Sequence, residues 1–210
     1  MLRFLSGAEL PFYPKLRSTM FRDRAAQFVG RLGWDVGVTD AGEERDQYDV
    51  LNPLYVIWEE RDGSHGGSMR FLPMTGRTML YEHFPDLAAG RDLRSPGIWE
   101  CTRFCLSPGA GPRVAAALML GGLELGLGQG LSHALGVFDA PMIRVYRRLG
   151  WAPELLGTRG RGREGISAGL WAFAPERRAV LLPRAGLSAE ISRHWHRRAM
   201  ERPEPLRLAG

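Results

Sequence analysis

Short runs of apolar and aromatic residues, bounded by glycine and proline, recur along the chain and predict β-strands. The clearest run is Ile98–Leu106, which has a Pro-Gly pair on each side. The run Leu54–Glu59 is followed by turn residues and then by a second run at 67–72, so these two runs predict a hairpin. Further strands are predicted at 131–138, 151–156 and 165–173.

Apolar residues at helical spacing predict helices in other segments. Residues 11–32 carry one apolar face, and residues 113–127 carry another, although several glycines there lower the helix propensity. A third helix is predicted at 141–149, with Asp139 as its N-cap and Gly150 as its C-cap. The remaining predictions are loops at 35–53 and 74–97, a helical turn near 83–87, and a short amphipathic helix around Ile191 and Trp195.

The order of these elements predicts the fold class. A helix and a hairpin come first, and crossover helices enter in the second half, which is typical of a mixed sheet flanked by helices in an α/β or α+β arrangement. The chain has 210 residues, 44% of them apolar, which is enough for one sizeable core. We expect a single domain over residues 1–201 and a loose tail at 202–210.

Charged residues interrupt the apolar runs in two strands. Glu100 and Arg103 lie within the Ile98–Leu106 run, and Arg70 lies in the middle of the run at 67–72. A charge in a buried strand is costly unless it is paired, so these residues form either structural ion pairs or a reaction centre. Glu100 and Arg103 would face opposite sides of a regular strand, and a β-bulge is one way to bring them together.

The net charge of +5 comes almost entirely from arginine, since Lys15 is the single lysine. A basic cluster favours an acidic partner. No helix-turn-helix, zinc-finger or RNA-binding motif accompanies it, so we do not expect nucleic acid as a partner. A regulatory, non-enzymatic domain would leave the strand charges unexplained. The clustered residues are Arg147, Arg148, Arg159, Arg161 and Arg163.

Compartment and redox state follow from the remaining composition. No apolar run reaches about 18 residues and the first ten residues do not form a secretory signal, so we expect a cytoplasmic protein without stable membrane insertion. Cys101 and Cys105 would face the same side of one strand, about 13 Å apart, which is too far for a disulfide. We expect buried structural cysteines and no metal site.

Four motifs occur in order along the first half of the chain. They are Arg24-x-x-x-Phe28-x-x-Arg31-Leu-Gly-Trp34, Glu44-x-Asp46-Gln-Tyr-Asp49, Ser68-Met-Arg70-Phe-Leu-Pro73 and Trp99-Glu100-Cys-Thr-Arg103-Phe104. Together they resemble the acyl-homoserine-lactone synthases, the autoinducer synthases of bacterial quorum sensing, over residues 1–175. Two small departures are Thr102, where many members have serine, and Met74, where threonine is common.

The resemblance implies an α/β fold related to the N-acetyltransferase superfamily, with a mixed, centrally splayed sheet flanked by helices. It implies S-adenosylmethionine as a substrate that donates its amine, and a fatty acyl group on acyl carrier protein or, less often, on coenzyme A. The products would be an acyl-homoserine lactone and methylthioadenosine, and no cofactor is implied.

Site residues follow from this chemistry. A protonated α-amine needs a proton acceptor, for which Glu100 is the first candidate and Asp46 the second, and Arg103 completes the catalytic set. Arg70 and Asp49 either contact the substrate or only brace the loop. The expected substrate-binding residues are Arg24, Phe28, Trp34, Asp49, Arg70 and Phe104.

The acyl tail needs an apolar channel, although the same residues also suit ordinary core packing. Glycines on the helix at 113–127 leave room for a medium or long chain. Family members that prefer a 3-oxo group tend to carry a threonine near the position of Gly136, which has no hydroxyl, so we expect an unsubstituted or unsaturated chain. The expected lining is Leu118, Met119, Gly122, Leu125, Leu135, Gly136, Val137 and Met142.

The arginine cluster and the reaction each have an alternative interpretation. The five clustered arginines would dock an acidic acyl carrier protein, or they form a solvated surface in an arginine-rich chain. An ordinary N-acetyltransferase that uses acyl coenzyme A is the alternative function. Its glycine-rich pyrophosphate loop is poorly matched by residues 107–113 here.

Overall fold

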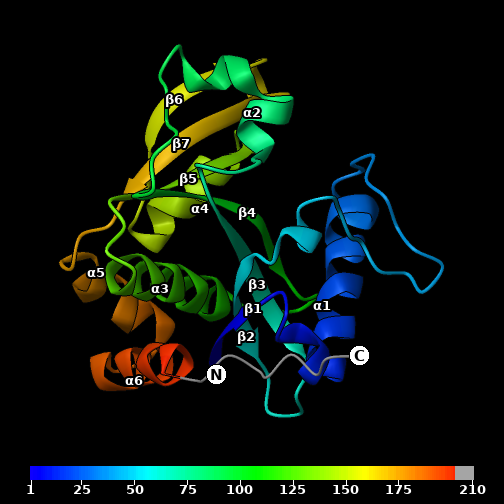
Figure 1. The fold of residues 1–210 in the computed structure, drawn as a ribbon, viewed down its shortest axis with the longest axis vertical. Helices are drawn as coiled ribbons and strands as arrows, with labels where there is room; N and C mark the ends of the chain where they lie inside the picture. The colour runs from blue at the N-terminus through cyan, green and yellow to red at the C-terminus, as the bar shows by residue number, and fades with distance from the viewer. Residues whose placement is uncertain (202–210) are drawn as a thin grey trace.

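A computed structural model describes residues 1–201, so the predicted tail at 202–210 lies outside the described residues. The described residues form one seven-stranded sheet in the order β1-β2-β3-β4-β5-β7-β6 (Figure 1). The strands are β1 (Leu2–Ser6), β2 (Leu54–Glu59), β3 (His65–Pro73), β4 (Ile98–Leu106), β5 (His133–Asp139), β6 (Glu154–Arg159) and β7 (Ile166–Ala172).

Helices cover both faces of this sheet. The first helix continues into a π-helical turn, Ala26–Arg31, a rare form that is frequent at functional sites. No helix within residues 1–201 is both long and apolar enough to cross a membrane. The helices are α1 (Pro14–Ala25), α2 (Met79–His83), α3 (Pro112–Gly128), α4 (Met142–Leu149), α5 (Arg177–Ala185) and α6 (Ala189–Met200).

The sheet opens at its centre. Among the described strands, β4 and β5 are the one parallel pair. Only Ile98–Cys101 of β4 pairs with β5, opposite residues 133–136. Beyond this point β4 continues along β3, and β5 continues along β7, so the two central strands separate. The predicted mixed and centrally splayed sheet is confirmed.

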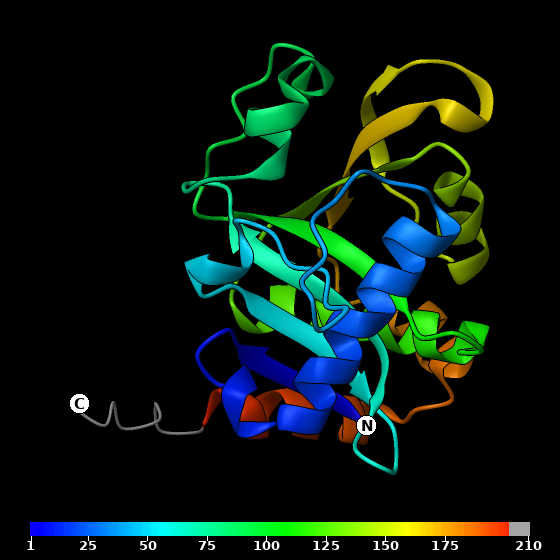
Figure 2. The same ribbon diagram turned by 90° about the vertical axis from the view of Figure 1, so that its right-hand side faces the viewer.

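Three apolar clusters hold the layers together. α3, α5 and α6 pack on one face of the sheet, and α3 contributes most of the largest cluster. On the other face, α1 packs on β1 and β2, while α2 and the turn Pro85–Ala88 pack on β5 and β7. In Figure 2, α1 crosses the near face of the sheet and the segment with α2 stands apart from it, above the strands. The space between these two clusters holds the charged residues described below.

β4 contains a bulge at Arg103. Ser68 and Arg70 of β3 pair with Cys105 and Thr102 of β4. One residue separates the two positions in β3 and two residues separate them in β4, so β4 has one extra residue there. Arg103 is this extra residue. Its φ of 54° lies in the left-handed region, which non-glycine residues rarely adopt. Its side chain therefore lies on the same face of the sheet as the side chain of Thr102.

The bulge also corrects the expectation for the cysteines. Cys101 packs into the cluster under α3, with its Sγ 3.8 Å from Sδ of Met69. Cys105 pairs with Ser68 on the α1 side and is fully buried. The prediction that both thiols face one side was wrong, because the extra residue reverses the alternation between them. Both are free cysteines.

Several element predictions need correction. β1 and α5 were not predicted, and the strand expected at 151–156 begins three residues later, at Glu154. Asp139 does not cap α4, because it pairs with Ile166 as the last residue of β5. Gly150 ends α4 as predicted, with a φ of 85°.

Candidate active site

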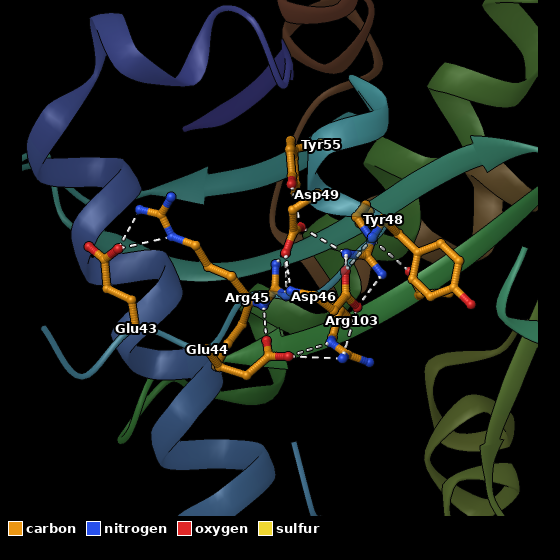
Figure 3. A network of polar contacts seen from close by, with 11 residues as sticks. Glu43, Glu44, Arg45, Asp46, Tyr48, Asp49, Tyr55 and Arg103 are labelled. Atoms are coloured by element: carbon orange, nitrogen blue, oxygen red, sulfur yellow. Dashed lines mark hydrogen bonds and ion pairs between the residues drawn. The ribbon is translucent and has the colours of Figure 1, made fainter. Parts of the chain in front are cut away.

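Three arginines from three different elements meet three carboxylates of one loop. Arg24 comes from α1, Arg70 from β3 and Arg103 from the bulge of β4. The carboxylates belong to the segment of the chain between α1 and β2, and Figure 3 shows Glu44 directed toward Arg103. We call these residues the ion-pair network, and its carboxylates are Glu44, Asp46 and Asp49.

Arg24 anchors the loop to α1. Its Nη1 and Nη2 atoms donate to the two carboxylate oxygens of Asp49, each at 3.0 Å, and its Nε donates to Glu44. Tyr55 donates a further hydrogen bond of 2.6 Å to Asp49. Arg24 and Glu44 have at most 1% exposure, so this pairing is part of the core.

Arg70 binds the same loop from the sheet side. Its Nη2 donates to Asp46 at 2.8 Å and its Nη1 to Asp49 at 2.7 Å, while its Nε donates to the hydroxyl of Thr102 at 3.0 Å. The side chain is 1% exposed. Arg70 therefore fixes Asp46 and Asp49 relative to β3 and β4.

Arg103 completes the network because the bulge turns it toward the loop. Its Nη2 lies 2.8 Å from Glu44 and 2.9 Å from Asp46. Its guanidinium carbon also lies 5.2 Å from the centre of the Phe28 ring, within the range of a cation–π contact. Arg103 thus connects the charged loop to the aromatic residues of the π-helical turn.

The network is neutral as a whole, and each side chain favours the ionised state of its partners. Burial alone would raise the pKa of Asp46 and Asp49, but neighbouring guanidiniums outweigh it and lower both values. Arg70 is the main cause for Asp46, and Arg24 and Arg70 act on Asp49. Both carboxylates are therefore ionised at neutral pH.

A cavity of about 1350 Å³ begins beside this network. Asp46 and Arg103 line it together with Phe28 and Trp34, whose rings stack at 5.0 Å with an interplanar angle of 8°. We call the part with Phe28, Trp34, Asp46 and Arg103 the charged chamber. Phe104 also lines the cavity, but on the α3 side of the sheet, where its ring contacts that of Tyr146.

The other members of the network lie behind this wall. Arg24, Asp49 and Arg70 do not line the cavity, and neither does Glu44. Their hydrogen bonds hold Asp46 and Arg103 in place. The geometry therefore favours the bracing interpretation for Arg70 and Asp49 over direct contact with a substrate.

The cavity continues through the opening between β4 and β5 to the α3 side of the sheet. There its lining is apolar and largely aromatic, and Gly126 leaves the space that the ring of Phe173 fills. We call this part the apolar chamber. Its lining includes Met69, Phe71, Met119, Gly122, Ala134, Phe138, Tyr146, Trp151, Trp171 and Phe173.

The structure divides the residues expected to line an acyl channel. Met119, Gly122, Gly136, Val137 and Met142 line the cavity. The other three expected residues do not line it. Leu118 and Leu125 are fully buried in the cluster around α3, and Leu135 faces the α2 side of β5, because side chains alternate along a strand.

Glu100 lies beside the cavity but does not line it. Its two carboxylate oxygens accept the backbone N–H groups of Met79, at 2.8 Å, and Leu80, at 2.7 Å, at the beginning of α2. Burial raises the pKa of Glu100 to about 7, although these two N–H donors and Arg70 oppose the rise. Glu100 is therefore a carboxylate that can exchange a proton near neutral pH and that also holds α2.

α2 is attached to the charged loop as well. The hydroxyl of Tyr48 donates to Glu82 at 2.8 Å, and Arg77 pairs with the same carboxylate. The ring of Tyr48 lies between the guanidiniums of Arg70 and Arg77, at 5.4 and 5.8 Å. Because Met79 on α2 lines the cavity, these contacts set the position of one cavity wall.

The five predicted docking arginines do not form one equivalent set. Arg147 and Arg148 are exposed on α4, and Arg161 is exposed before the turn Gly162–Glu164. Arg163 lines the cavity, whereas Arg159 is paired with Asp86. The exposed members of this set, on α4 and before the turn, are the part that can meet a partner.

Some site residues were not expected from the sequence. Glu44 contacts Arg24 and Arg103, and Thr102 accepts a hydrogen bond from Arg70. Tyr48 donates a hydrogen bond to α2, and Tyr55 donates one to the loop. Glu44 and Tyr48 stand inside the second motif, which was the available signal. Tyr55 gave no signal, since an aromatic residue in a strand usually serves packing. No group of three potential metal ligands occurs in the part of the chain that the structure describes.

Comparison with known proteins identifies the family. The family model described as autoinducer synthase matches residues 13–171. The chain belongs to the autoinducer synthase family. A relative from Rhizobium etli, named acyl-homoserine-lactone synthase, is 44% identical over 181 residues, which cover 81% of this chain and 84% of the relative. One from Agrobacterium fabrum with the same name is 34% identical and covers 69% of this chain and 72% of its own.

Solved structures agree with this assignment. The coenzyme A-dependent acyl-homoserine lactone synthase MesI superposes with a TM-score of 0.78 at 28% identity, covering 90% of this chain and 97% of its own. An N-acetyltransferase from Lactobacillus plantarum superposes with a TM-score of 0.55 at 12% identity, covering 82% of this chain and 99% of its own, which shows the fold alone. The chain is an enzyme of the acyltransferase class, as its curated relatives are.

Proposed function

We propose that this synthase transfers a fatty acyl group from acyl carrier protein to the α-amine of S-adenosylmethionine and then closes the lactone with release of methylthioadenosine. The observation that carries the proposal is the single cavity with a charged chamber on one side of the sheet and an apolar chamber on the other. One chamber suits a zwitterionic nucleoside, and the other suits an alkyl chain. The cytoplasm is the proposed compartment, in agreement with the curated acyl-homoserine-lactone synthases that the chain resembles.

S-adenosylmethionine is assigned to the charged chamber. Its sulfonium and ammonium groups favour the aromatic faces of Phe28 and Trp34 and the carboxylate of Asp46, and its carboxylate favours Arg103. A related synthase, BjaI, is 25% identical and was solved with S-adenosylmethionine and isopentyl coenzyme A, which supports this assignment. Arg24, Asp49 and Arg70 act as positioning residues behind the chamber wall.

Acyl transfer requires the amine in its neutral form. A free α-amine has a pKa of about 7.7–8.0, so a carboxylate must accept a proton at neutral pH. Glu100 has the better matched pKa, at about 7, whereas Asp46 has the better position, since it lines the cavity. We assign Glu100 as the proton acceptor and Asp46 as the group that orients the ammonium.

The thioester is assigned to the opening between the central strands. Where β4 and β5 separate, their facing backbone groups no longer bond to each other, so N–H groups there are available to an oxygen that gains negative charge. Attack of the amine forms the amide and expels the thiol of the donor. The methionine carboxylate then attacks its own γ-carbon, and methylthioadenosine leaves; holding the reacting atoms close promotes this step.

The apolar chamber is assigned to the acyl tail, with an unsubstituted or unsaturated chain of medium to long length. A Cβ at Gly136 would lie 3.0 Å from the ring of Trp171, so this position leaves little room for a hydroxyl-bearing side chain that would recognise a 3-oxo group. Two observations bear on the donor. The exposed arginines of α4 support the acidic carrier protein, while the solved relatives MesI and BjaI are coenzyme A-dependent.

One experiment tests the reaction and its donor. Purified protein with S-adenosylmethionine and an acyl carrier protein loaded with a C8–C14 chain should release methylthioadenosine and a lactone of matching mass. Parallel reactions with the same acyl groups on coenzyme A, and with acetyl coenzyme A and simple amines, give the alternatives. Acetylation of simple amines without methylthioadenosine release would overturn the proposal in favour of an ordinary N-acetyltransferase.

A further inference from the structure

A second, smaller cavity lies far from the catalytic residues in the fold. It has a volume of about 290 Å³ and lies between the end of α3 and the helices α5 and α6. It shares no lining residue with the catalytic cavity. We call it the helical pocket, and its lining is Glu124, Leu127, Gly128, Arg178, Arg193, His196 and Arg197.

The floor of the helical pocket is fixed by a buried ion pair. Glu124 is 3% exposed and accepts from Nε and Nη2 of Arg178, at 2.9 and 2.7 Å. The hydroxyl of Ser192 donates a third hydrogen bond of 2.9 Å to Glu124. The carboxylate is thereby satisfied, whereas Arg178 has five N–H donors and uses only two of them here.

The walls add unpaired positive charge. Arg193 and Arg197 stand one turn apart on α6, so their side chains lie on one face of the helix. Arg193 forms no ion pair with any residue of the described chain, and Arg197 has only an exposed contact of 3.9 Å with Glu201. Three guanidiniums therefore surround one carboxylate, and two positive charges remain in excess.

His196 supplies a polar atom that lacks a partner. Its ring packs edge-on against Phe4 and lies against Gly128, where a Cβ would overlap the imidazole. Its Nε2 is buried and has no hydrogen-bond partner within residues 1–201. A buried polar atom without a partner is costly, so a ligand atom that bonds to Nε2 would offset this cost.

The carbonyl end of α3 does not offset this positive field entirely. Its last carbonyls, at Leu125, Gly126 and Leu127, accept N–H groups from residues 129–131. The partial negative charge of a helix end resides on carbonyls without partners, so this capping reduces it. The excess charge of the arginines consequently dominates the pocket.

We propose that the helical pocket binds a phosphate monoester group. A phosphate monoester carries between one and two negative charges at neutral pH and offers three acceptor oxygens, which matches the excess charge and the free guanidinium donors. Arg178 forms the fixed donor, and Arg193 and Arg197 close on the ligand from α6. The volume suits a small metabolite, and the head group of a lipid presents the same chemistry.

Calorimetric titration with inorganic phosphate and with glycerol 3-phosphate tests this site, at constant ionic strength set with chloride. The double variant Arg193→Gln/Arg197→Gln should bind both probes at least tenfold more weakly than the unchanged protein. The matched control, Arg177→Gln/Arg198→Gln, removes the same charge from exposed positions of α5 and α6 outside the pocket, and its affinity should stay within twofold. Glutamine is a good helix former, so both variants should keep α6.

Three outcomes would overturn the proposal: no binding of either probe or of vesicles that contain phosphatidic acid, equal loss in both double variants, or unchanged affinity in the pocket variant. Flotation with vesicles that contain phosphatidic acid separates the two sources. Binding of the vesicles but not of glycerol 3-phosphate assigns the group to a lipid, and the reverse assigns it to a metabolite. Turnover does not enter this test, so it stands independently of the proposed reaction.

Discussion

The two chambers of the catalytic cavity face each other through the opening in the sheet, yet different interactions hold their walls in place. The wall of the charged chamber is held by hydrogen bonds and ion pairs from three elements. The apolar chamber is held by packing of α3, α4 and the aromatic residues of β5 and β7. Charged walls depend on the identity of each side chain, whereas apolar walls depend mainly on the space that remains.

This difference predicts different responses to mutation. Removal of one charge from the ion-pair network leaves its partners buried and unpaired, so stability and binding should fall together. Substitution in the apolar chamber changes the volume for the acyl tail, so the product should change while the fold persists. The following predictions test this contrast.

Arg24→Ala should have the largest effect on stability. It leaves the buried Glu44 and Asp49 without their main partner, and loss of one member of a buried pair typically costs about 3–5 kcal/mol. Urea unfolding measures it. Arg91→Ala is the matched control, because Arg91 pairs with Glu154 at the surface, and it should cost no more than about 1 kcal/mol. Equal losses would contradict the bracing role of the network.

Glu100→Gln should lower turnover by about 10²–10⁴-fold, the usual contribution of a general base. In the unchanged protein kcat/KM should rise with pH around 7, as Glu100 ionises, and the variant should lack this limb. Asp46→Asn should keep the limb and weaken S-adenosylmethionine binding. Near-normal turnover of Glu100→Gln across the pH range would exclude Glu100 as the base.

Glu100 should also make stability depend on pH. Its folded pKa, about 7, is above its ordinary value of 4.5, so its stabilising contribution is complete below pH 4.5 and is lost as the pH rises through 7. Glu100→Gln should remove this dependence, although it also weakens the cap of α2, because an amide offers one oxygen to two N–H donors. Denaturation at pH 5 and pH 8 provides the comparison.

Trp34→Ala should weaken S-adenosylmethionine binding by roughly fivefold, since an aromatic stack or a cation–π contact contributes about 1 kcal/mol. Trp34 is 36% exposed, so the fold should persist. Calorimetry gives the affinity, and Val38→Ala in the same loop, at an exposed position outside the cavity, is the control. Unchanged affinity in Trp34→Ala would remove it from the substrate site.

Gly122→Leu should shift the product toward shorter acyl chains at nearly normal methylthioadenosine release. A Cβ at Gly122 would already lie 3.1 Å from Met69 and 3.3 Å from Phe71, so a larger side chain must occupy the chamber. Gly30→Ala, where a Cβ meets no atom within 4 Å, is the control. Mass spectrometry of the lactones reads the result, and an unchanged chain length would show that the tail lies elsewhere.

Arg147→Glu/Arg148→Glu should have the smallest effect. The Michaelis constant for acyl carrier protein should rise several-fold, more at low salt, while that for acyl coenzyme A stays constant. Arg177→Glu/Arg198→Glu carries the same charge change on α5 and α6 and should leave both constants unchanged. If the two double variants behave alike, docking on α4 is wrong.

The sequence predicted β2 and β4 to the residue, because both are apolar runs with clear turn residues around them. β1 was not predicted: Leu2–Ser6 is short, and its strand conformation depends on pairing with β2. α5 was missed because Pro183 lies inside it, where proline usually ends a helix. Tertiary contacts decided both segments.

For the site, motif spacing identified which charged residues belong together, since six of the predicted residues lie in or beside the ion-pair network. It did not show which of them reach the cavity. Arg70 and Asp49 look equivalent to Arg103 and Asp46 along the sequence, yet two lie behind the wall and two line it. That distinction depends on the bulge and on the path of the loop, which no local pattern encodes.

The bulge at Arg103 divides β4 into two segments of opposite parity. Before the bulge, even-numbered residues face the side of the sheet that carries α1 and α2, as Glu100 and Thr102 do. After it, odd-numbered residues face that side, as Cys105 does. Deletion of Arg103 would restore a regular strand in which Phe104 and Cys105 keep their present faces, whereas straightening the strand without a deletion would move both to the opposite faces. A comparison of related chains that shifts a gap by one residue within this strand would therefore pair a wall of one chamber with a wall of the other.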